Sequence, residues 1–173
     1  RPLGEVRTLA LDASSLTSNA LAQILFHEYF GHLPDLVVLP PELNPMLSVA
    51  DAAVLIGDRG MQIPPPGVEV WDLGEAWTSR TKLPFVWAVW LARPDFPSKG
   101  VQILQDSLAR GLRELNEVAD THGPAQGFTV ERAMAYLSTA IDYRLDNAHR
   151  AGLALFQEKL RECTILPGAA SLA

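Results

Sequence analysis

Four hydroxyl side chains fall within five positions near the start of the chain, at Ser14, Ser15, Thr17 and Ser18. They follow an apolar segment, residues 7–11, that predicts a strand, and they overlap the beginning of a helical apolar pattern in residues 16–30. The first turn of a helix leaves backbone N–H groups unpaired and carries the positive end of the helix dipole, so it attracts a carboxylate or a phosphate. We therefore predict an anion-binding site at this junction. The alternative is plain N-capping, for which one hydroxyl is enough.

A second candidate position is the pair Gly57 and Asp58, which follows a short apolar run in residues 52–56. Consecutive apolar residues are typical of a strand that is covered on both faces, as in a parallel sheet. Ligands of such sheets bind at the carboxyl ends of the strands. If this strand neighbours the first one, Asp58 lies near the bound anion and accepts a hydrogen bond from a substrate hydroxyl. The alternative is an ordinary turn in which Asp58 pairs with Arg59 or Arg80.

Other kinds of catalytic centre have little support in the sequence. The four histidines do not have the spacing of metal ligands, and the sequence contains neither a Gly-x-Ser-x-Gly elbow nor a phosphate-binding glycine motif. We expect no metal and no organic cofactor. The segment that contains Asp142, Tyr143, Arg144 and Asp146 reads as an ion-paired connection between helices. The single cysteine, Cys163, excludes an internal disulfide and is interpreted as a packing residue.

The elements that position these residues alternate between strand and helix in the first half of the chain. Strands are predicted at residues 7–11, 35–39, 52–56, 68–71 and 85–91, and helices at residues 16–30, 44–49 and 72–80. This alternation predicts an α/β fold with a mostly parallel sheet flanked by helices. Later helices are predicted at residues 98–122, after Thr129, and at residues 146–162. We divide the chain into an α/β ligand-binding lobe, residues 1–93, and a helical C-terminal section, residues 94–173, that packs on the lobe and frays at residues 168–173.

The overall composition limits the classes of partner. The chain has 173 residues, 48% hydrophobic and 20% charged, with a formal net charge of −6, which argues against a nucleic-acid or anionic-membrane surface. The longest apolar run, residues 83–92, is too short to span a bilayer. We predict a cytoplasmic protein without nucleic-acid or membrane partners. The apolar faces of the later helices exceed what the first unit covers, which implies a partner lobe that this chain lacks.

Several ordered blocks resemble the chorismate dehydratases of the futalosine route to menaquinone. The blocks are Leu11-Asp-Ala-Ser-Ser-Leu-Thr-Ser18, Asp51-Ala-Ala-Val-Leu-Ile-Gly-Asp58, Asp72-Leu-Gly-Glu-Ala-Trp77, Thr81-Lys-Leu-Pro-Phe-Val-Trp-Ala-Val-Trp90 and Ile141-Asp-Tyr-Arg-Leu145. The sister enzyme of the pathway, which processes a cyclic futalosine, has Ile-His-Glu where this chain has Ile56-Gly57-Asp58. The dehydratases are therefore the better match.

The resemblance implies a fold like that of the type II periplasmic binding proteins, in which two α/β lobes close on a ligand. It also implies a further lobe ahead of Arg1, with polar residues, among them an asparagine, that touch the substrate. The implied reaction removes water from chorismate to give 3-[(1-carboxyvinyl)oxy]benzoate without a metal or organic cofactor. The substrate's own enolpyruvyl carboxylate is thought to act as the base.

The resemblance also suggests roles for the candidate residues. Ser14, Ser15, Thr17 and Ser18 correspond to the anion clamp of the second lobe. Gly57 and Asp58 lie at the cleft, with Asp58 near the ring hydroxyl as the candidate catalytic residue. Phe85 and Trp87 either line the pocket or pack in the core.

Type II lobes also occur without catalysis. They serve as solute receptors and as effector-sensing domains of transcription regulators, so binding of a small carboxylate alone is the main alternative function. A non-catalytic interaction domain is a third reading, favoured if the chain occurs naturally without a second lobe.

Overall fold

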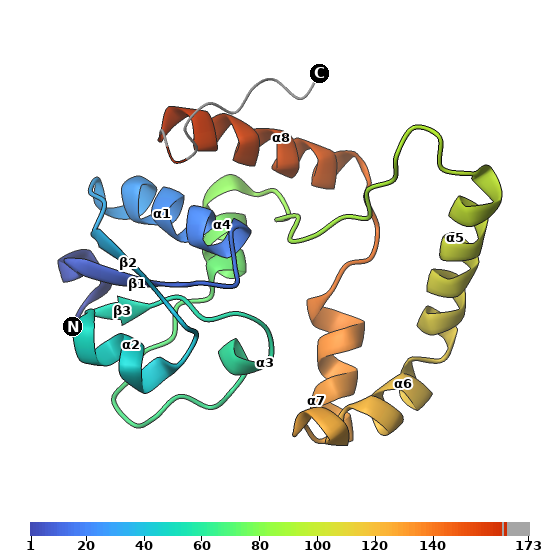
Figure 1. The fold of residues 1–173 in the computed structure, drawn as a ribbon, viewed down its shortest axis with the longest axis horizontal. Coiled ribbons are helices and arrows are strands. Elements are labelled where there is room, and N and C mark those ends of the chain that lie inside the picture. The colour runs from blue at the N-terminus through green and yellow to red at the C-terminus, as the bar shows by residue number, and fades with distance from the viewer. Residues whose placement is uncertain (164, 166–173) are drawn as a thin grey trace. The chain divides into compact units, whose positions relative to one another are not determined.

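A computed structural model describes residues 1–163 and 165 of the chain. Its contacts divide the chain into two compact units (Figure 1). One unit, here called the sheet unit, comprises Arg1–Trp87 together with Leu145–Ala173. The other, the helical unit, comprises Ala88–Arg144. The boundary predicted between residues 93 and 94 concerns the ligand-binding lobe and stays a prediction.

The sheet unit contains a three-stranded parallel sheet in the order β2-β1-β3. The central strand β1 (Thr8–Asp12) pairs along its whole length with β2 (Asp35–Leu39) and at Leu9 and Ala10 with β3 (Ala52–Ala53). The connection from β1 to β2 and the one from β2 to β3 run across the sheet in opposite directions. Because such crossovers are right-handed, their helices fall on opposite faces of the sheet. This places β1 between two layers and explains why four of its five residues are buried.

Within the described residues this unit contains five α-helices: α1 (Thr17–Phe30), α2 (Leu43–Val49), the four-residue α3 (Gly57–Gly60), α4 (Leu73–Thr81) and α8 (Asn147–Glu162). Their ends follow local chemistry. The side chains of Asp72 and Asp146 accept hydrogen bonds from the first-turn N–H groups of α4 and α8, as N-caps do. Gly31 ends α1 with a left-handed φ of 70°, a conformation that glycine adopts at no steric cost.

The helix α1 is the centre of the core, because it buries residues on two sides. Ala22 and Phe26 pack toward the sheet with Leu9 and Leu11 of β1. Leu21, Ile24 and Leu25 form a second cluster with residues of α4 and α8. In that second cluster the ring of Trp77, which is fully buried, lies 5.4 Å from the ring of Phe85 and 6.1 Å from that of Phe156. A helix that is apolar around most of its circumference is expected to be enclosed in this way.

An ion-pair network at the edge of this core joins three helices. Glu28 of α1 accepts hydrogen bonds from Lys159 of α8 at 2.7 Å and from Arg80 of α4 at 3.3 Å. The hydrogen bond from Lys159 is the main cause of a lowered pKa of the Glu28 carboxyl, and Arg80 adds to it. The network therefore favours the ionised form of Glu28 and fixes α4 and α8 against α1.

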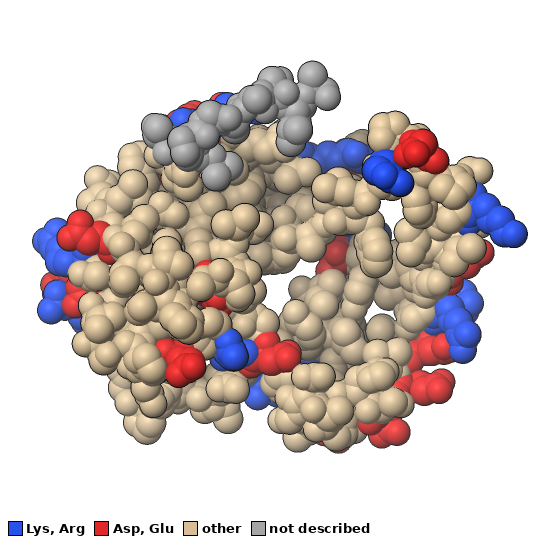
Figure 2. Space-filling view, viewed as in Figure 1, with Lys and Arg blue, Asp and Glu red and all other residues tan. Residues whose placement is uncertain are grey.

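The helical unit is built from short helices. They are α5 (Ser98–Arg113), α6 (Leu115–His122), the 3₁₀ turn η2 (Pro124–Gln126), α7 (Val130–Ala135) and a π-helical turn, η3 (Tyr136–Ala140). The helices α6 and α7 meet closely at Gly123, where an added Cβ would lie 2.6 Å from the carbonyl oxygen of Ala119 and 2.9 Å from Cβ of Ala133. One face of α5 stays about 40% exposed, at Val101, Leu104, Leu108 and Leu112. Acidic and basic side chains are interspersed over the visible surface (Figure 2).

Most of the predicted elements are confirmed. The strands at residues 7–11 and 35–39 and the helices at residues 16–30, 44–49, 72–80 and 146–162 correspond to β1, β2, α1, α2, α4 and α8. The helix predicted after Thr129 is α7, with the Thr129 hydroxyl accepting from the N–H of Arg132 as its cap. The α/β class with a parallel sheet flanked by helices is therefore confirmed. The type II binding-protein fold stays a prediction.

Four element predictions need correction. In the described residues the sheet has three strands, and the segments 68–71 and 85–91 are not among them. The first follows a proline-rich turn and leaves Val70 68% exposed, and the second uses Phe85 for ring packing while Trp90 is 87% exposed. The strand predicted at residues 52–56 is shorter, because β3 covers its first two residues and one further hydrogen bond to β1 follows, from the N–H of Val54. The helix predicted at residues 98–122 is broken at Glu114, whose φ of −107° and ψ of 22° are not helical. The frayed tail predicted at 168–173 lies outside the described residues.

Candidate functional site

The strand-to-helix connection between β1 and α1, residues 12–19, contains the four predicted hydroxyl residues and is here called the β1–α1 turn. β1 ends at Asp12 and α1 begins at Thr17, so the turn lies at the carboxyl edge of the sheet. In parallel sheets this is the edge at which ligands bind. The sequence prediction of a strand-to-helix junction at this point is confirmed.

Asp12 is the centre of hydrogen bonding in the turn. Its Oδ1 accepts from the backbone N–H of Ser14 at 2.8 Å and from the Ser14 hydroxyl at 2.5 Å. Its backbone carbonyl accepts from the N–H of Ser15 at 3.1 Å and from Nδ2 of Asn19 at 2.8 Å. The Asp12 side chain is 1% exposed, and within the described residues its Oδ2 has no hydrogen-bond partner. One buried carboxylate thus organises the whole turn.

The four hydroxyl residues differ in their surroundings. Ser15 Oγ accepts from the N–H of Ser18 at 3.2 Å, which is a capping contact, and both residues are 7% exposed. Thr17 is half-buried and Ser14 is exposed. The alternative that one hydroxyl caps the helix therefore applies to Ser15. Ser14 donates to Asp12, and the hydroxyls of Thr17 and Ser18 are left for other contacts.

Unpaired donors remain at the beginning of α1. Within residues 1–163 and 165 no hydrogen bond is recorded from the backbone N–H groups of Leu16 and Thr17. The first N–H groups of a helix have no intrahelical partner and carry partial positive charge. Together with the hydroxyls of Ser15 and Thr17 they provide donors for an anion at this end of the helix.

Gly57 and Asp58 emerge at the same edge of the sheet as the β1–α1 turn. β3 is hydrogen-bonded to β1 in parallel, and the pairing continues to the N–H of Val54, which donates to the carbonyl of Ala10 at 2.8 Å. The condition set for a role of Asp58, that its strand neighbours the first one, is therefore met. Gly57 takes a left-handed φ of 57° at the start of α3, and Asp58 is exposed in the same short helix. The alternative was an ion pair of Asp58 with Arg59 or Arg80. Arg80 pairs with Glu28 instead, and among the described residues no ion pair of Asp58 is seen.

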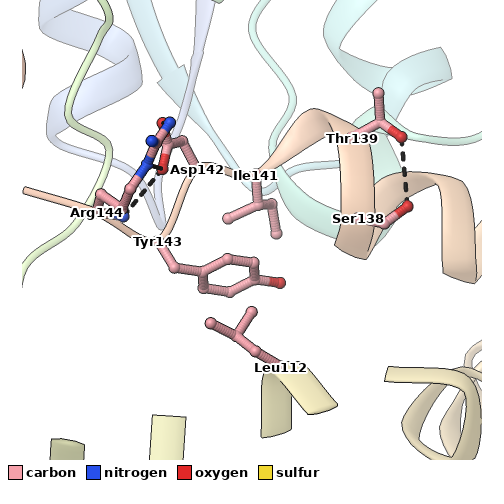
Figure 3. A pocket seen from close by; sticks show the side chains of 7 residues that line it. All are labelled: Leu112, Ser138, Thr139, Ile141, Asp142, Tyr143 and Arg144. Atoms are coloured by element: carbon pink, nitrogen blue, oxygen red, sulfur yellow. Dashed lines mark hydrogen bonds and ion pairs between the residues drawn. The ribbon is translucent and has the colours of Figure 1, made fainter. Parts of the chain in front are cut away.

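A separate pocket of about 350 Å³ lies within the helical unit (Figure 3). It is lined by Leu112, Ser138, Thr139, Ile141, Asp142, Tyr143 and Arg144. Arg144 donates from Nε to Oδ1 of Asp142 at 2.9 Å and from Nη2 to Oδ2 at 2.8 Å, so the predicted ion-paired connection is confirmed for this pair. The Tyr143 hydroxyl donates to the carbonyl of Leu137 at 3.1 Å, and burial raises its pKa.

Asp146, the remaining member of the predicted polar segment, has a different role. It caps α8, and its Oδ1 lies 2.8 Å from Nδ1 of His149, a contact that lowers the pKa of the Asp146 carboxyl. In the part of the chain that the structure describes, no three His, Cys, Asp or Glu side chains are grouped as metal ligands. None of the described helices combines the length and the apolar character needed to cross a bilayer.

Comparison with known proteins gives the family of the chain. A family model described as menaquinone biosynthesis matches residues 1–162. The chain belongs to this menaquinone-biosynthesis family. It is also 33% identical to a protein named chorismate dehydratase from Thermus thermophilus, over 91% of this chain and 64% of that protein. The chain thus spans just under two thirds of the length of this relative. The resemblance recognised from the sequence blocks is confirmed at the level of the family.

Reasoning from the sequence missed two residues that form hydrogen bonds in the β1–α1 turn, Asp12 and Asn19. The strand was predicted to end at residue 11, so Asp12 was placed in a loop, although it is the buried last residue of β1. One signal could have identified it. An Asp followed two positions later by a serine is typical of a turn in which the carboxylate accepts from the backbone N–H of the second residue.

Proposed function

We propose that the chain is part of a lyase that dehydrates chorismate to 3-[(1-carboxyvinyl)oxy]benzoate in menaquinone biosynthesis. Its membership of the menaquinone-biosynthesis family and its 33% identity to a chorismate dehydratase support this proposal. The structural observation that carries it is the β1–α1 turn. This turn offers N–H and hydroxyl donors for a carboxylate at the sheet edge where Asp58 also emerges.

The reaction demands little acid–base chemistry from the protein. A ring C–H proton and the ring hydroxyl leave together as water, and the ring becomes aromatic, so the elimination is strongly favoured once the geometry is right. The main tasks are to hold the substrate and to exclude water. The enolpyruvyl carboxylate of the substrate serves as the base in this proposal, which agrees with the lack of an obvious general base in the turn.

The β1–α1 turn takes one carboxylate of the dianion in this proposal. The N–H groups of Leu16 and Thr17 and the hydroxyls of Ser15 and Thr17 are the donors. Ser18, which is buried, supports the turn through its N–H. A helix N-terminus is suited to this task because its N–H groups are already oriented and carry positive charge before the ligand arrives.

Gly57 and Asp58 contact the part of the substrate that carries the leaving hydroxyl. The left-handed φ of Gly57 turns the chain sharply after β3, and Asp58 is exposed beside it. In this proposal the Asp58 carboxylate accepts a hydrogen bond from a substrate hydroxyl. Asp58 is the proposed catalytic residue. The type II binding-protein fold, a further lobe, the absence of a cofactor and a cytoplasmic location belong to the same proposal.

The test is an ultraviolet assay of chorismate with the full-length protein and no added metal, following formation of the enolpyruvyl benzoate. Product formation at a rate above that of a Gly57→Val variant is the expected result. The variant is a suitable control because a β-branched residue cannot easily take a φ of 57°. If chorismate is unchanged after prolonged incubation, the proposed reaction is wrong.

The alternative is a sensor or receptor that binds a small carboxylate without turning it over. The β1–α1 turn alone supports binding, because its N–H and hydroxyl groups can donate hydrogen bonds to an anion. No residue of the turn is assigned the role of a base. Calorimetry with chorismate separates the two functions, since heat of binding without product favours the receptor.

A further inference from the structure

Ser14 differs from the other hydroxyl residues of the β1–α1 turn because its proton is already committed. Its hydroxyl donates to Oδ1 of Asp12 at 2.5 Å, and its N–H donates to the same atom at 2.8 Å. A serine hydroxyl has one proton to donate and two lone pairs that accept. With the proton directed to Asp12, the exposed Ser14 oxygen has only lone pairs left for a ligand.

Asp12 organises the β1–α1 turn through Oδ1 and its backbone carbonyl, but its second carboxyl oxygen adds nothing to that hydrogen bonding. Its carboxylate is 1% exposed, none of the recorded ion pairs of the described residues includes it, and its Oδ2 is unpaired among those residues. Burying a carboxylate with an unsatisfied oxygen costs free energy. The hydrogen bonds through Oδ1 account for the turn, whereas the burial of the unpartnered Oδ2 is explained if Asp12 also serves the site.

We infer that Asp12 is a positioning residue that makes Ser14 a hydrogen-bond acceptor for the hydroxyl of a carboxylate ligand. The inference rests on the proposed anion-binding role of the turn and makes it more specific. The N–H groups of Leu16 and Thr17 donate to the carboxylate of the ligand. Ser14, oriented by Asp12, accepts from a hydroxyl of the same ligand. The turn thus discriminates a hydroxylated ring acid from the same acid without the hydroxyl.

Two ring acids, one with a hydroxyl and one without, test whether Ser14 accepts a hydrogen bond from the ligand. The test does not require turnover. The probes are 4-hydroxycyclohexanecarboxylate, with both ring isomers measured, and cyclohexanecarboxylate, which lacks the hydroxyl. Dissociation constants for the full-length protein are measured by ligand-observed NMR. One added hydrogen bond of ordinary strength corresponds to about a 3- to 10-fold preference for one hydroxylated isomer. Equal binding of all probes, or no binding of any, overturns the inference.

Variants then assign the preference to Ser14 and Asp12. Ser14→Ala is expected to abolish the preference while the dissociation constant for cyclohexanecarboxylate changes less than about twofold. Asp12→Ala should abolish it as well. Asp12→Asn should keep it, because the Ser14 N–H donates to Oδ1 and so selects the amide oxygen rather than the amide nitrogen at that position.

A matched control separates these effects from a general loss of structure. Ser107 is an exposed serine of α5 whose hydroxyl donates to the carbonyl of Ile103, so Ser107→Ala should leave the preference unchanged. A Ser14→Ala protein that retains the preference would show that Ser14 does not accept from the ligand. Turnover of chorismate by the same preparation tests the proposed reaction separately. Turnover without a preference refutes only the role of Ser14, and a preference without turnover refutes only the reaction.

Discussion

The packing of α8 against the rest of the sheet unit depends on Gly152. A Cβ added at this position would lie 2.1 Å from the carbonyl oxygen of Pro84 and 3.7 Å from Cβ of Leu83. Real Cβ atoms essentially never come within 3.0 Å of a heavy atom outside their own residue and its two chain neighbours. In Gly152→Ala, either α8 or the segment that contains Pro84 must therefore move by roughly 1 Å, because a packed interior has no free space for a methyl group.

Two opposing effects determine the free energy of this change. Replacing glycine by alanine inside a helix normally stabilises it by about 0.5–1 kcal/mol. Overpacking a core costs about 1–3 kcal/mol, and here the displaced helix also carries Phe156, whose ring lies 4.9 Å from that of Phe85. The steric effect should dominate. We expect Gly152→Ala to lower the free energy of unfolding by about 1 kcal/mol, the overpacking cost less the gain from alanine.

The assay is urea unfolding followed by far-ultraviolet circular dichroism and by tryptophan fluorescence, to which the buried Trp77 contributes. Gly111→Ala is the matched control, because it makes the same substitution within α5, where an added Cβ meets nothing within 4 Å. The control should be slightly more stable than the unmodified protein. If Gly152→Ala unfolds at the same urea concentration as the control, then α8 does not approach Pro84 this closely and the reasoning is wrong.

Three further predictions concern the ion-pair network and the site. Glu28→Gln should cost about 1 kcal/mol of stability at pH 7. Because the folded protein lowers the pKa of Glu28, that stability is present above the pKa of the unfolded chain and is lost as the pH falls through the folded value, so the difference in urea midpoint between variant and parent should shrink in acid. The double change Ser15→Ala with Thr17→Ala should weaken chorismate binding by about 1–3 kcal/mol in calorimetry, and unchanged affinity would remove both hydroxyls from the clamp. Asp58→Asn should reduce turnover with an unchanged melting temperature, whereas a lower melting temperature would mean that Asp58 is structural.

The parts of the fold that could be predicted are those in which local signals and packing agree. The apolar residues of α1 recur with helical spacing and Gly31 marks its end, and the helix is buried on the sides that this pattern indicates. The strand β2 is stopped by two prolines and was predicted at its observed bounds. Asp72 and Asp146 precede their helices as caps, so both starts could be placed within a residue.

The parts that could not be predicted depend on contacts between distant residues. The segment 85–91 has the composition of a strand, yet pairing needs a neighbour, and in the described residues none lies beside it. Its Phe85 packs instead against Trp77 and Phe156, which are 8 and 71 positions away in the sequence. A pattern of apolar residues indicates burial but does not distinguish a strand ladder from an aromatic cluster.

The candidate site shows the same limit at the level of single hydrogen bonds. Counting hydroxyls in residues 14–18 treats them as equivalent donors, but the structure gives each a different state. Ser15 caps the helix, Ser18 is buried in its first turn, and the Ser14 hydroxyl donates a hydrogen bond to Asp12. This distribution follows from the burial of Asp12 at the end of β1, which no spacing rule specifies. The sequence suggests four equivalent donors, but the turn instead has donors at Leu16 and Thr17 and an acceptor at Ser14. Such a site suits a ligand that carries both a carboxylate and a hydroxyl better than it suits a simple anion.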